Sequence, residues 1–229
     1  MKATKLITAL LFSVVVTSLL QAQENELGWT MDSAIKQLDR QGSDLETVLA
    51  QVDIDWSGEA QGLDRIRTGR IYFNDDGDFR IAGETPNKKT LLVEGRKLHM
   101  YDPAASQVTE VSLSRDKGRL EPYMRLGFSI TGRDLKDDFL ITFAGEGEIG
   151  DRRTLTLELT PKRDAVRAIV SKIEIAFDQA SWLPARQIIT HTSGTQTLTV
   201  TYSGTARNLN LNPDLFRAKW PRGTDKVRE

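Results

Sequence analysis

The chain has 229 residues, of which 31 are Lys or Arg and 32 are Asp or Glu, so its formal net charge is −1. Such a balance lacks the clustered basic surface on which nucleic-acid binding depends, and no nucleic-acid partner is expected. The chain contains no cysteine, which excludes disulfide bonds and thiol nucleophiles, so its fold must be stabilised by a hydrophobic core.

The amino-terminal segment has the layout of a secretory signal peptide. Two lysines precede an uncharged apolar run over residues 6–20, and Ala22 is a small residue suited to cleavage. The run is shorter than the roughly 20 residues that a transmembrane helix needs. We expect residues 1–22 to be removed and residues 23–229 to form one exported domain with a net charge of −3. No cysteine follows the run, so no lipid anchor is expected.

Residues 28–42 predict the first helix of the exported domain. Met31, Ile35 and Leu38 recur at spacings of four and three, which places them on one apolar stripe of a helix. A glycine at the end of this segment is typical of a helix terminus.

From residue 45 the apolar period changes from that of a helix to that of a strand. Along residues 47–56 apolar side chains alternate with polar ones, so Asp53 and Asp55 are expected on a solvent-facing side. The same alternation continues to residue 207, with Gly, Pro, Asn or Asp at the boundaries. We predict ten or eleven strands, and the connections are too short for parallel crossovers, which indicates an antiparallel sheet.

Two segments interrupt the strand pattern. Residues 114–138 do not alternate and predict one or two short helices, and residues 162–170 predict a smaller helix. Between the strands, residues 96–113 form two extended arms around an Asp-Pro break, which is typical of a hairpin.

The chain has few residues of the types that commonly serve in catalysis. Ser129 with His99 or His191 is the only hydrolytic combination, but the glycines near Ser129 lack the G-x-S-x-G spacing, and we interpret both histidines as surface residues. The acidic turn at residues 74–79 lacks the twelve-residue ligand pattern of a calcium loop and is interpreted as a hairpin turn. We expect no enzymatic activity, no metal site and no cofactor.

Several architectures satisfy this pattern. A second sheet, closure into a barrel, or a half-open barrel covered by the helix and residues 114–138 would each bury the apolar face. Periodicity alone favours a plain core over a ligand cavity.

The predicted opening helix and four later segments, in order along the chain, resemble the outer-membrane lipoprotein carrier (LolA-type) family and its divergent lipoprotein-sorting branch. The later segments are TGRIYFNDDGDFRI (68–81), LLVEGRKLHMYDPAASQVTEVSL (91–113), FDQASWLPARQI (177–188) and DLFRAKWPRGTDKV (214–227). The resemblance implies a mainly β (α+β) fold: a half-open antiparallel β-barrel of about eleven strands, with helices forming a lid over a hydrophobic cavity. It also implies a periplasmic shuttle that takes acylated lipoproteins from an inner-membrane exporter to an outer-membrane receptor.

Within this fold we assign two sets of apolar residues to lipid binding. The predicted cavity residues are Ile71, Phe73, Phe79, Leu91, Val93, Met100, Phe143, Leu157, Ile175 and Ile188. The predicted lid residues are Met31, Ile35, Leu38, Met124 and Phe128. Family members often carry a basic residue followed by Pro in the turn after the second strand, where an Arg holds the lid. This chain has residues 74–77 there, so that role is not transferred, and Arg80 is assigned a structural role.

Three other functions fit the same pattern. A regulatory sensor of the RseB type shares the fold and binds a membrane protein until it meets lipid, although such sensors carry a second domain. A shuttle for a free lipid or glycolipid would use the same cavity. A closed barrel with a dry core would have a structural task only. The even distribution of polar residues favours a monomer.

Overall fold

The computed structural model of the protein describes residues 28–58, 66–84, 88–113, 121–128 and 132–229. The chain divides into Met1–Thr30 and Met31–Glu229, and every helix and strand given below belongs to the second unit. The predicted signal peptide and Ser129 lie outside the described residues. Among the helices of the described part, none is long and apolar enough to cross a membrane.

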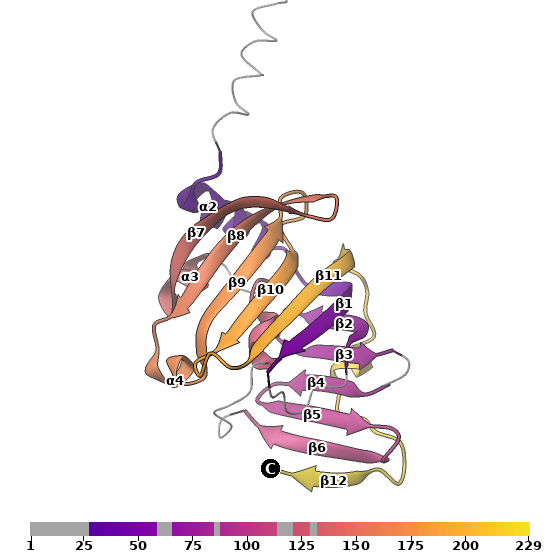
Figure 1. The fold of residues 1–229 in the computed structure, drawn as a ribbon. Helices are drawn as coiled ribbons and strands as arrows, with labels where there is room; N and C mark the ends of the chain where they lie inside the picture. Colours follow the sequence, from indigo (N-terminus) through magenta and orange to yellow (C-terminus); the bar gives the residue numbers. More distant parts are fainter. Residues whose placement is uncertain (1–27, 59–65, 85–87, 114–120, 129–131) are drawn as a thin grey trace, which may run out of the picture. The chain divides into compact units, whose positions relative to one another are not determined.

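The second unit is built on one twelve-stranded sheet (Figure 1). Its strands are β1 (Thr47–Ser57), β2 (Thr68–Asn74), β3 (Phe79–Gly83), β4 (Thr90–Glu94), β5 (Lys97–Asp102), β6 (Gln107–Ser112), β7 (Phe139–Ile149), β8 (Arg152–Pro161), β9 (Val170–Asp178), β10 (Pro184–His191), β11 (Thr197–Arg207) and β12 (Asp225–Arg228). The order across the sheet is β12-β6-β5-β4-β3-β2-β1-β11-β10-β9-β8-β7. The end strands β12 and β7 do not pair, so the sheet stays unclosed, as in an open barrel. The predicted mainly β fold is confirmed.

Short helices occur where the strand alternation fails. They are α2 (Met31–Gly42), η2 (Glu121–Arg125), α3 (Gly132–Asp138), α4 (Asp164–Arg167) and η3 (Pro213–Phe216). The helices predicted within residues 28–42, 114–138 and 162–170 are thereby confirmed, with shorter bounds. The predicted turn at residues 74–79 is also confirmed, since the Gly77 amide donates to the Asn74 carbonyl at 3.1 Å.

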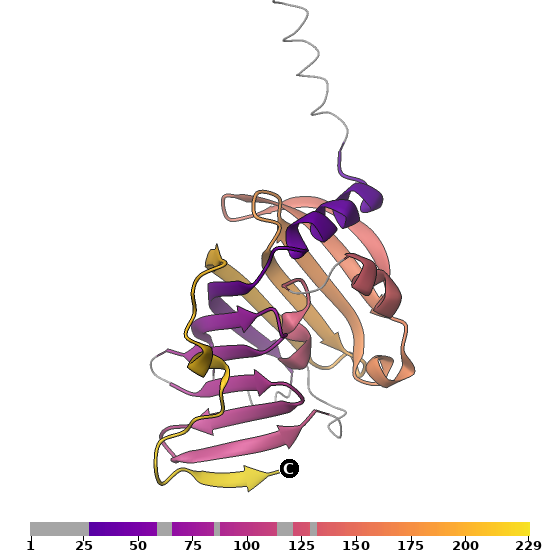
Figure 2. The same cartoon turned by 180° about the vertical axis from the view of Figure 1, so that it is seen from behind.

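Strand β12 corrects the prediction of a wholly antiparallel sheet, because it pairs in parallel with β6. Residues 208–224 cross the β2–β4 part of the sheet before β12 begins (Figure 2). They carry the chain from the end of β11 to the free edge of β6, where β12 pairs. All four β12 residues are exposed, so no apolar alternation marks this strand in the sequence.

The strand register creates one apolar face, which we call the inner face. In β2–β5 it aligns Phe73, Phe79, Val93 and Leu98, none of which is more than 1% exposed. Figure 2 shows α2 and α3 in front of β7–β10. An added Cβ at Gly132 would lie 2.5 Å from the Cγ2 atom of Ile35, so this glycine allows α3 to approach α2 closely.

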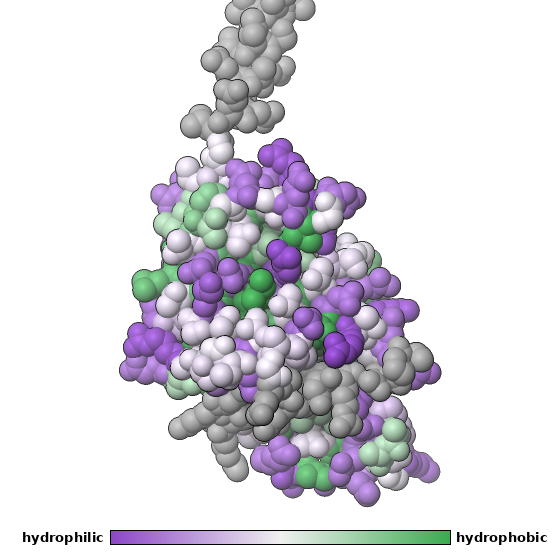
Figure 3. Space-filling model, viewed as in Figure 1, coloured by the Kyte–Doolittle hydropathy of each residue, from purple (hydrophilic) through white to green (hydrophobic). Residues whose placement is uncertain are grey.

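The opposite, outer face is polar along β8–β11. Lys172 lies 3.2 Å from Glu158 and 3.4 Å from Glu174, which forms a line of exposed or half-exposed charges. Asp53 and Asp55 are exposed, as predicted. Seen from the side shown in Figure 1, the molecular surface is mostly hydrophilic to neutral, with scattered hydrophobic residues (Figure 3).

The carboxy-terminal segment covers the outer face of β3–β5. The Trp220 ring stacks on Tyr101 at a centroid distance of 5.0 Å, and the Arg80 guanidinium lies 5.9 Å from the same indole. Arg80 also donates to the Leu215 carbonyl at 3.3 Å, which is consistent with a structural role. Because Trp220 also lies 6.2 Å from His99, that histidine is only 4% exposed, and its prediction as a surface residue was wrong.

Candidate functional site

Most predicted cavity residues lie together on the inner face. The register aligns two rows across β2–β5 and a third row across β7–β9. The rows are Ile71-Ile81-Leu91-Met100, Phe73-Phe79-Val93 and Ile175-Leu157-Phe143. The placement of these residues on one face agrees with the prediction, while their contact with lipid stays a prediction.

Ile188 is the exception and is corrected. It pairs with Glu174 and Thr199 on the outer face, whereas its neighbours Gln187 and Ile189 lie opposite Ile175 and Ile173 on the inner face. The two adjacent isoleucines leave the direction of alternation undecided, and a register shift between Pro184 and Arg186 changes the phase that the preceding residues set.

A short segment that pairs with no described strand covers part of the inner face. We call residues 123–128, which include the end of η2, the plug. Met124 is fully buried, and Leu126 and Phe128 are at most 5% exposed. The Phe128 ring lies 5.6 Å from Phe73 and 5.0 Å from Tyr202, edge-on to the latter. The plug therefore occupies part of the apolar surface that the predicted cavity residues form.

Gly127 brings the plug into direct contact with β9 and β10. Its φ of +90° is one that residues with a side chain rarely adopt. An added Cβ would also lie 2.8 Å from the Cγ atom of Pro184 and 3.5 Å from the Cγ2 atom of Ile175. Only glycine fits this position without displacing the plug from the sheet.

One buried polar contact holds the plug, and sequence reasoning missed it. The Gln187 side-chain amide donates a hydrogen bond to the Leu126 carbonyl, and the Tyr202 hydroxyl donates to the Gln187 side-chain oxygen at 2.6 Å. Both side chains are completely buried, and burial raises the pKa of Tyr202 well above its ordinary value, which keeps the hydroxyl a donor. The available signal was a glutamine at an inward position between Ala185 and Ile189.

The predicted lid residues separate into three groups. Met124 and Phe128 belong to the plug and lie against the inner face. Ile35 and Leu38 are buried on α2, which packs against α3. Met31, at the start of α2, is 36% exposed, which makes it the most accessible of the five.

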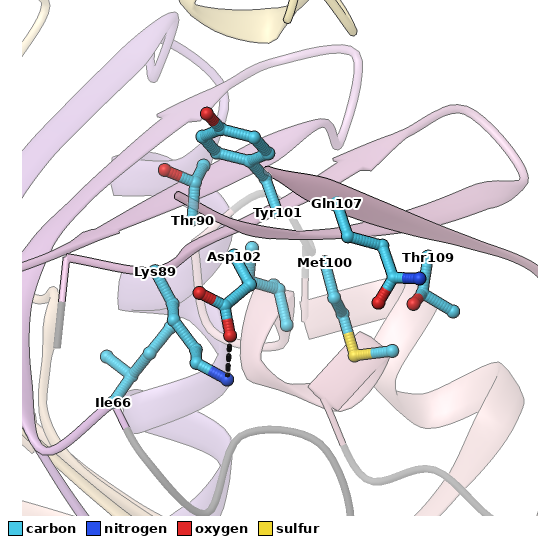
Figure 4. A pocket seen from close by; sticks show the side chains of 9 residues that line it. Ile66, Lys89, Thr90, Met100, Tyr101, Asp102, Gln107 and Thr109 are labelled. Carbon is cyan, nitrogen blue, oxygen red and sulfur yellow. Dashed lines mark ion pairs between the residues drawn. The ribbon is translucent and has the colours of Figure 1, made fainter. Parts of the chain in front are cut away.

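A first hollow, the hairpin pocket, lies at the end of β4–β6 next to the β5–β6 turn and has a volume of about 190 Å³ (Figure 4). Two predicted cavity residues, Leu91 and Met100, line it. Lys89 and Asp102 form an ion pair of 2.8 Å at its polar end, and the hydrogen bond from Lys89 is the main cause that lowers the pKa of Asp102. Figure 4 shows Met100 and this ion pair on one side of β5 and Tyr101 on the other.

A second hollow, the plug pocket, lies between the plug and the β4–β5 turn and has a volume of about 300 Å³. Its apolar lining includes Val93, Leu126 and Phe139. Pockets for small ligands commonly measure about 300–1,000 Å³, so the two hollows lie below or at the lower end of that range. Where the plug lies against the inner face, its own side chains fill the space.

The described part of the chain offers little for other chemistry. No group of three or more His, Cys, Asp or Glu side chains in it could hold a metal ion. His191 lies on β10, and its Nδ1 atom is 2.8 Å from the Ser193 hydroxyl within the exposed turn that follows.

Proteins of similar sequence are named lipoprotein carriers. The sequence profile of the family described as "Outer membrane lipoprotein carrier protein LolA" matches residues 44–219. A protein from Nitrosomonas europaea named "Outer-membrane lipoprotein carrier protein" is 26% identical over 165 residues, which cover 72% of this chain and 74% of the relative. A protein of the same name from Cupriavidus taiwanensis is 29% identical over 162 residues, which cover 71% of each chain.

Among solved structures, an uncharacterized conserved protein from Thermus thermophilus has a similar fold. It aligns with a TM-score of 0.53 at 12% sequence identity, and the alignment covers 87% of this chain and 100% of that protein.

The relatives named above are carrier proteins, which is consistent with a function other than catalysis. The profile match spans more than half of the sequence, so the chain belongs to the LolA family and is a lipoprotein carrier or a related binding protein.

Proposed function

We propose that this protein is a periplasmic carrier that binds the acyl chains of lipoproteins and shuttles them from the inner to the outer membrane. Residues 1–22 serve as the cleaved signal peptide, and the remaining chain works without a cofactor. By family resemblance, the carrier receives its cargo from an inner-membrane exporter and delivers it to an outer-membrane receptor.

The observation that carries this proposal is the covering of the inner face by the plug. Apolar rows from β2–β5 and β7–β9 meet a segment that makes no strand pairing with the described sheet and is held by one buried side-chain contact, from Gln187 to Leu126. Acyl chains take the place of the plug on these rows. Burial of an acyl chain yields about 0.8 kcal/mol per methylene, so binding by several long chains would otherwise be nearly irreversible.

Displacement of the plug lowers the net affinity to a range that allows release. Cargo has to expel Met124, Leu126 and Phe128 from the inner face, and the free energy of their burial is subtracted from that of the incoming chains. When cargo leaves, the plug covers the same surface again and prevents exposure of an apolar patch.

Native mass spectrometry of the mature protein, purified from the periplasm of its own host, tests the proposal. We expect an adduct with the mass of an acylated protein, and an adduct with a dipalmitoylated lipopeptide after incubation in vitro. An adduct with free lipid alone would favour a lipid shuttle. The absence of every adduct, including that with the lipopeptide, would contradict a carrier function.

Strand β7 provides a matched pair of variants for this test. Phe143 is half-buried on the inner face, and its neighbour Thr142 is exposed on the outer face. We expect Phe143→Asp to lose the lipopeptide adduct, because it places a charge on the apolar row, and Thr142→Asp to retain it. Circular dichroism checks that both variants keep the fold.

A further inference from the structure

The plug pocket combines an apolar wall with a cluster of cationic side chains. Three arginines line it, from three separate segments: Arg96 in the β4–β5 turn, Arg125 in the plug and Arg163 before α4. Asp138 is the one carboxylate among the lining residues. The lining therefore carries a net positive charge beside an apolar surface.

Two of the three guanidinium groups are not neutralised within the described chain. Arg163 lies 3.2 Å from the Asp138 carboxylate, which balances both charges. Arg96 and Arg125 are exposed and form no ion pair with any described residue. A positive charge left in this state attracts an anion from solution.

Tyr123 connects the charged and apolar parts of the pocket. Tyr123 lines the same pocket as Arg125 and Arg163. Burial raises the pKa of its half-buried hydroxyl, while Arg163 and Arg125 act in the opposite direction. The neutral hydroxyl is a further donor toward an anion.

The apolar wall continues into the inner face. Val93 is 1% exposed and belongs to the row that includes Phe79 and Phe73. Leu126 is the plug residue whose carbonyl Gln187 holds. An acyl chain attached to a group at the arginines would thus reach the inner face beside Val93 and Leu126.

We propose that the plug pocket binds the anionic, phosphate-bearing headgroup of a membrane lipid whose acyl chain lies on the inner face. Guanidinium groups suit this role because they bind phosphate oxygens through paired, charge-assisted hydrogen bonds. This inference rests on the proposed carrier function, since it requires that acyl chains replace the plug, and it extends the cargo to anionic lipids.

Two single-chain lipids with the same acyl chain test the headgroup site. Lysophosphatidylglycerol is anionic and lysophosphatidylcholine is zwitterionic, and calorimetric titration below their critical micelle concentrations measures Kd for each. We expect the mature protein to bind the anionic lipid about tenfold tighter, which corresponds to about 1.4 kcal/mol and is within reach of two exposed ion pairs. The preference should shrink in about 1 M salt, where the Debye length is about 3 Å.

The double variant Arg96→Gln/Arg125→Gln should lose the preference through weaker binding of the anionic lipid alone. The control Arg67→Gln/Arg186→Gln removes the same number of exposed charges outside the pocket and should keep it. Equal binding of both lipids by the unaltered protein would overturn the headgroup site and leave the carrier function standing. Binding of neither lipid would contradict both, and a preference that survives in the pocket variant would overturn the assigned location.

Discussion

Gln187 is a single polar side chain that fixes the plug on the apolar inner face. Its side chain accepts a hydrogen bond from the Tyr202 hydroxyl and donates one to the Leu126 carbonyl. The polar groups buried on the inner face are therefore hydrogen-bonded to one another. An unsatisfied buried polar group is costly, and this contact therefore favours one position of the plug over all others.

We predict that Gln187→Met lowers the free energy of unfolding. The variant retains the approximate shape of the side chain but leaves the Tyr202 hydroxyl and the Leu126 carbonyl without partners, at about 1–3 kcal/mol for each orphaned group. Urea denaturation followed by circular dichroism measures the change. Gln51→Met, at an exposed position of β1, is the control and should leave the unfolding midpoint nearly unchanged.

His99 adds a dependence of stability on pH. Burial beneath Trp220 lowers its pKa below the ordinary value of 6.5, although Glu110 and Glu94 act in the opposite direction; Lys97 and Lys226 lower it further. The unfolded chain consequently binds the proton more readily than the folded chain. The free energy of unfolding is therefore insensitive to His99 above the unfolded pKa and falls as the pH drops below it.

We predict a lower urea midpoint at about pH 5.5 than at about pH 7.5, because His99 has to be charged in a buried site. The pKa values of Asp102 and Glu110 are also lowered, mainly by hydrogen bonds from Lys89 and Lys97, but the stability they contribute is lost only near pH 4 and below. The variant His99→Leu should show a smaller difference between the two conditions. An equal difference in both proteins would show that His99 does not cause it.

At the scale of elements, the plug differs from the strands in what holds it. Each strand is fixed by a ladder of backbone hydrogen bonds, whereas the plug is fixed by side-chain packing and by the contact with Gln187. A segment held in this way separates from the sheet at a lower free energy than a strand, and such segments are the ones that move on ligand binding.

The absence of cysteine makes this movement measurable. We predict that Met124→Cys is protected from a thiol reagent in the unliganded protein and reacts faster when a dipalmitoylated lipopeptide is added, because Met124 is fully buried only while the plug covers the inner face. Leu92→Cys, equally buried but on the outer face of β4, should stay protected with and without lipopeptide. Equal protection of both cysteines after loading would rule out plug displacement.

At the scale of the whole described unit, two kinds of cover occupy the two faces of one sheet. Helices α2 and α3 and the plug lie over the inner face, and the carboxy-terminal segment with η3 lies over the outer face of β3–β5 (Figure 2). The open order of the sheet, from β12 to β7, leaves the inner face accessible without breaking any strand pair. The cleaved signal peptide and the monomeric state remain predictions.

Alternation in the sequence was sufficient to identify most strands and to group Phe73, Phe79 and Val93 on one face, since adjacent strand residues point to opposite sides. It failed at Ile188, where two apolar residues are adjacent and the strand carries a register shift. It also failed at β12, whose residues are all exposed. In both cases the deciding information lies in a neighbouring strand.

Local period and composition were enough to predict the mainly β class, the short helices and the apolar character of the inner face. Long-range packing was needed to establish that the plug covers part of this face, that Gln187 holds it and that Trp220 buries His99. Each of these contacts joins residues far apart in the chain. Such pairings depend on how the whole sheet curves and pairs, and no local pattern encodes them.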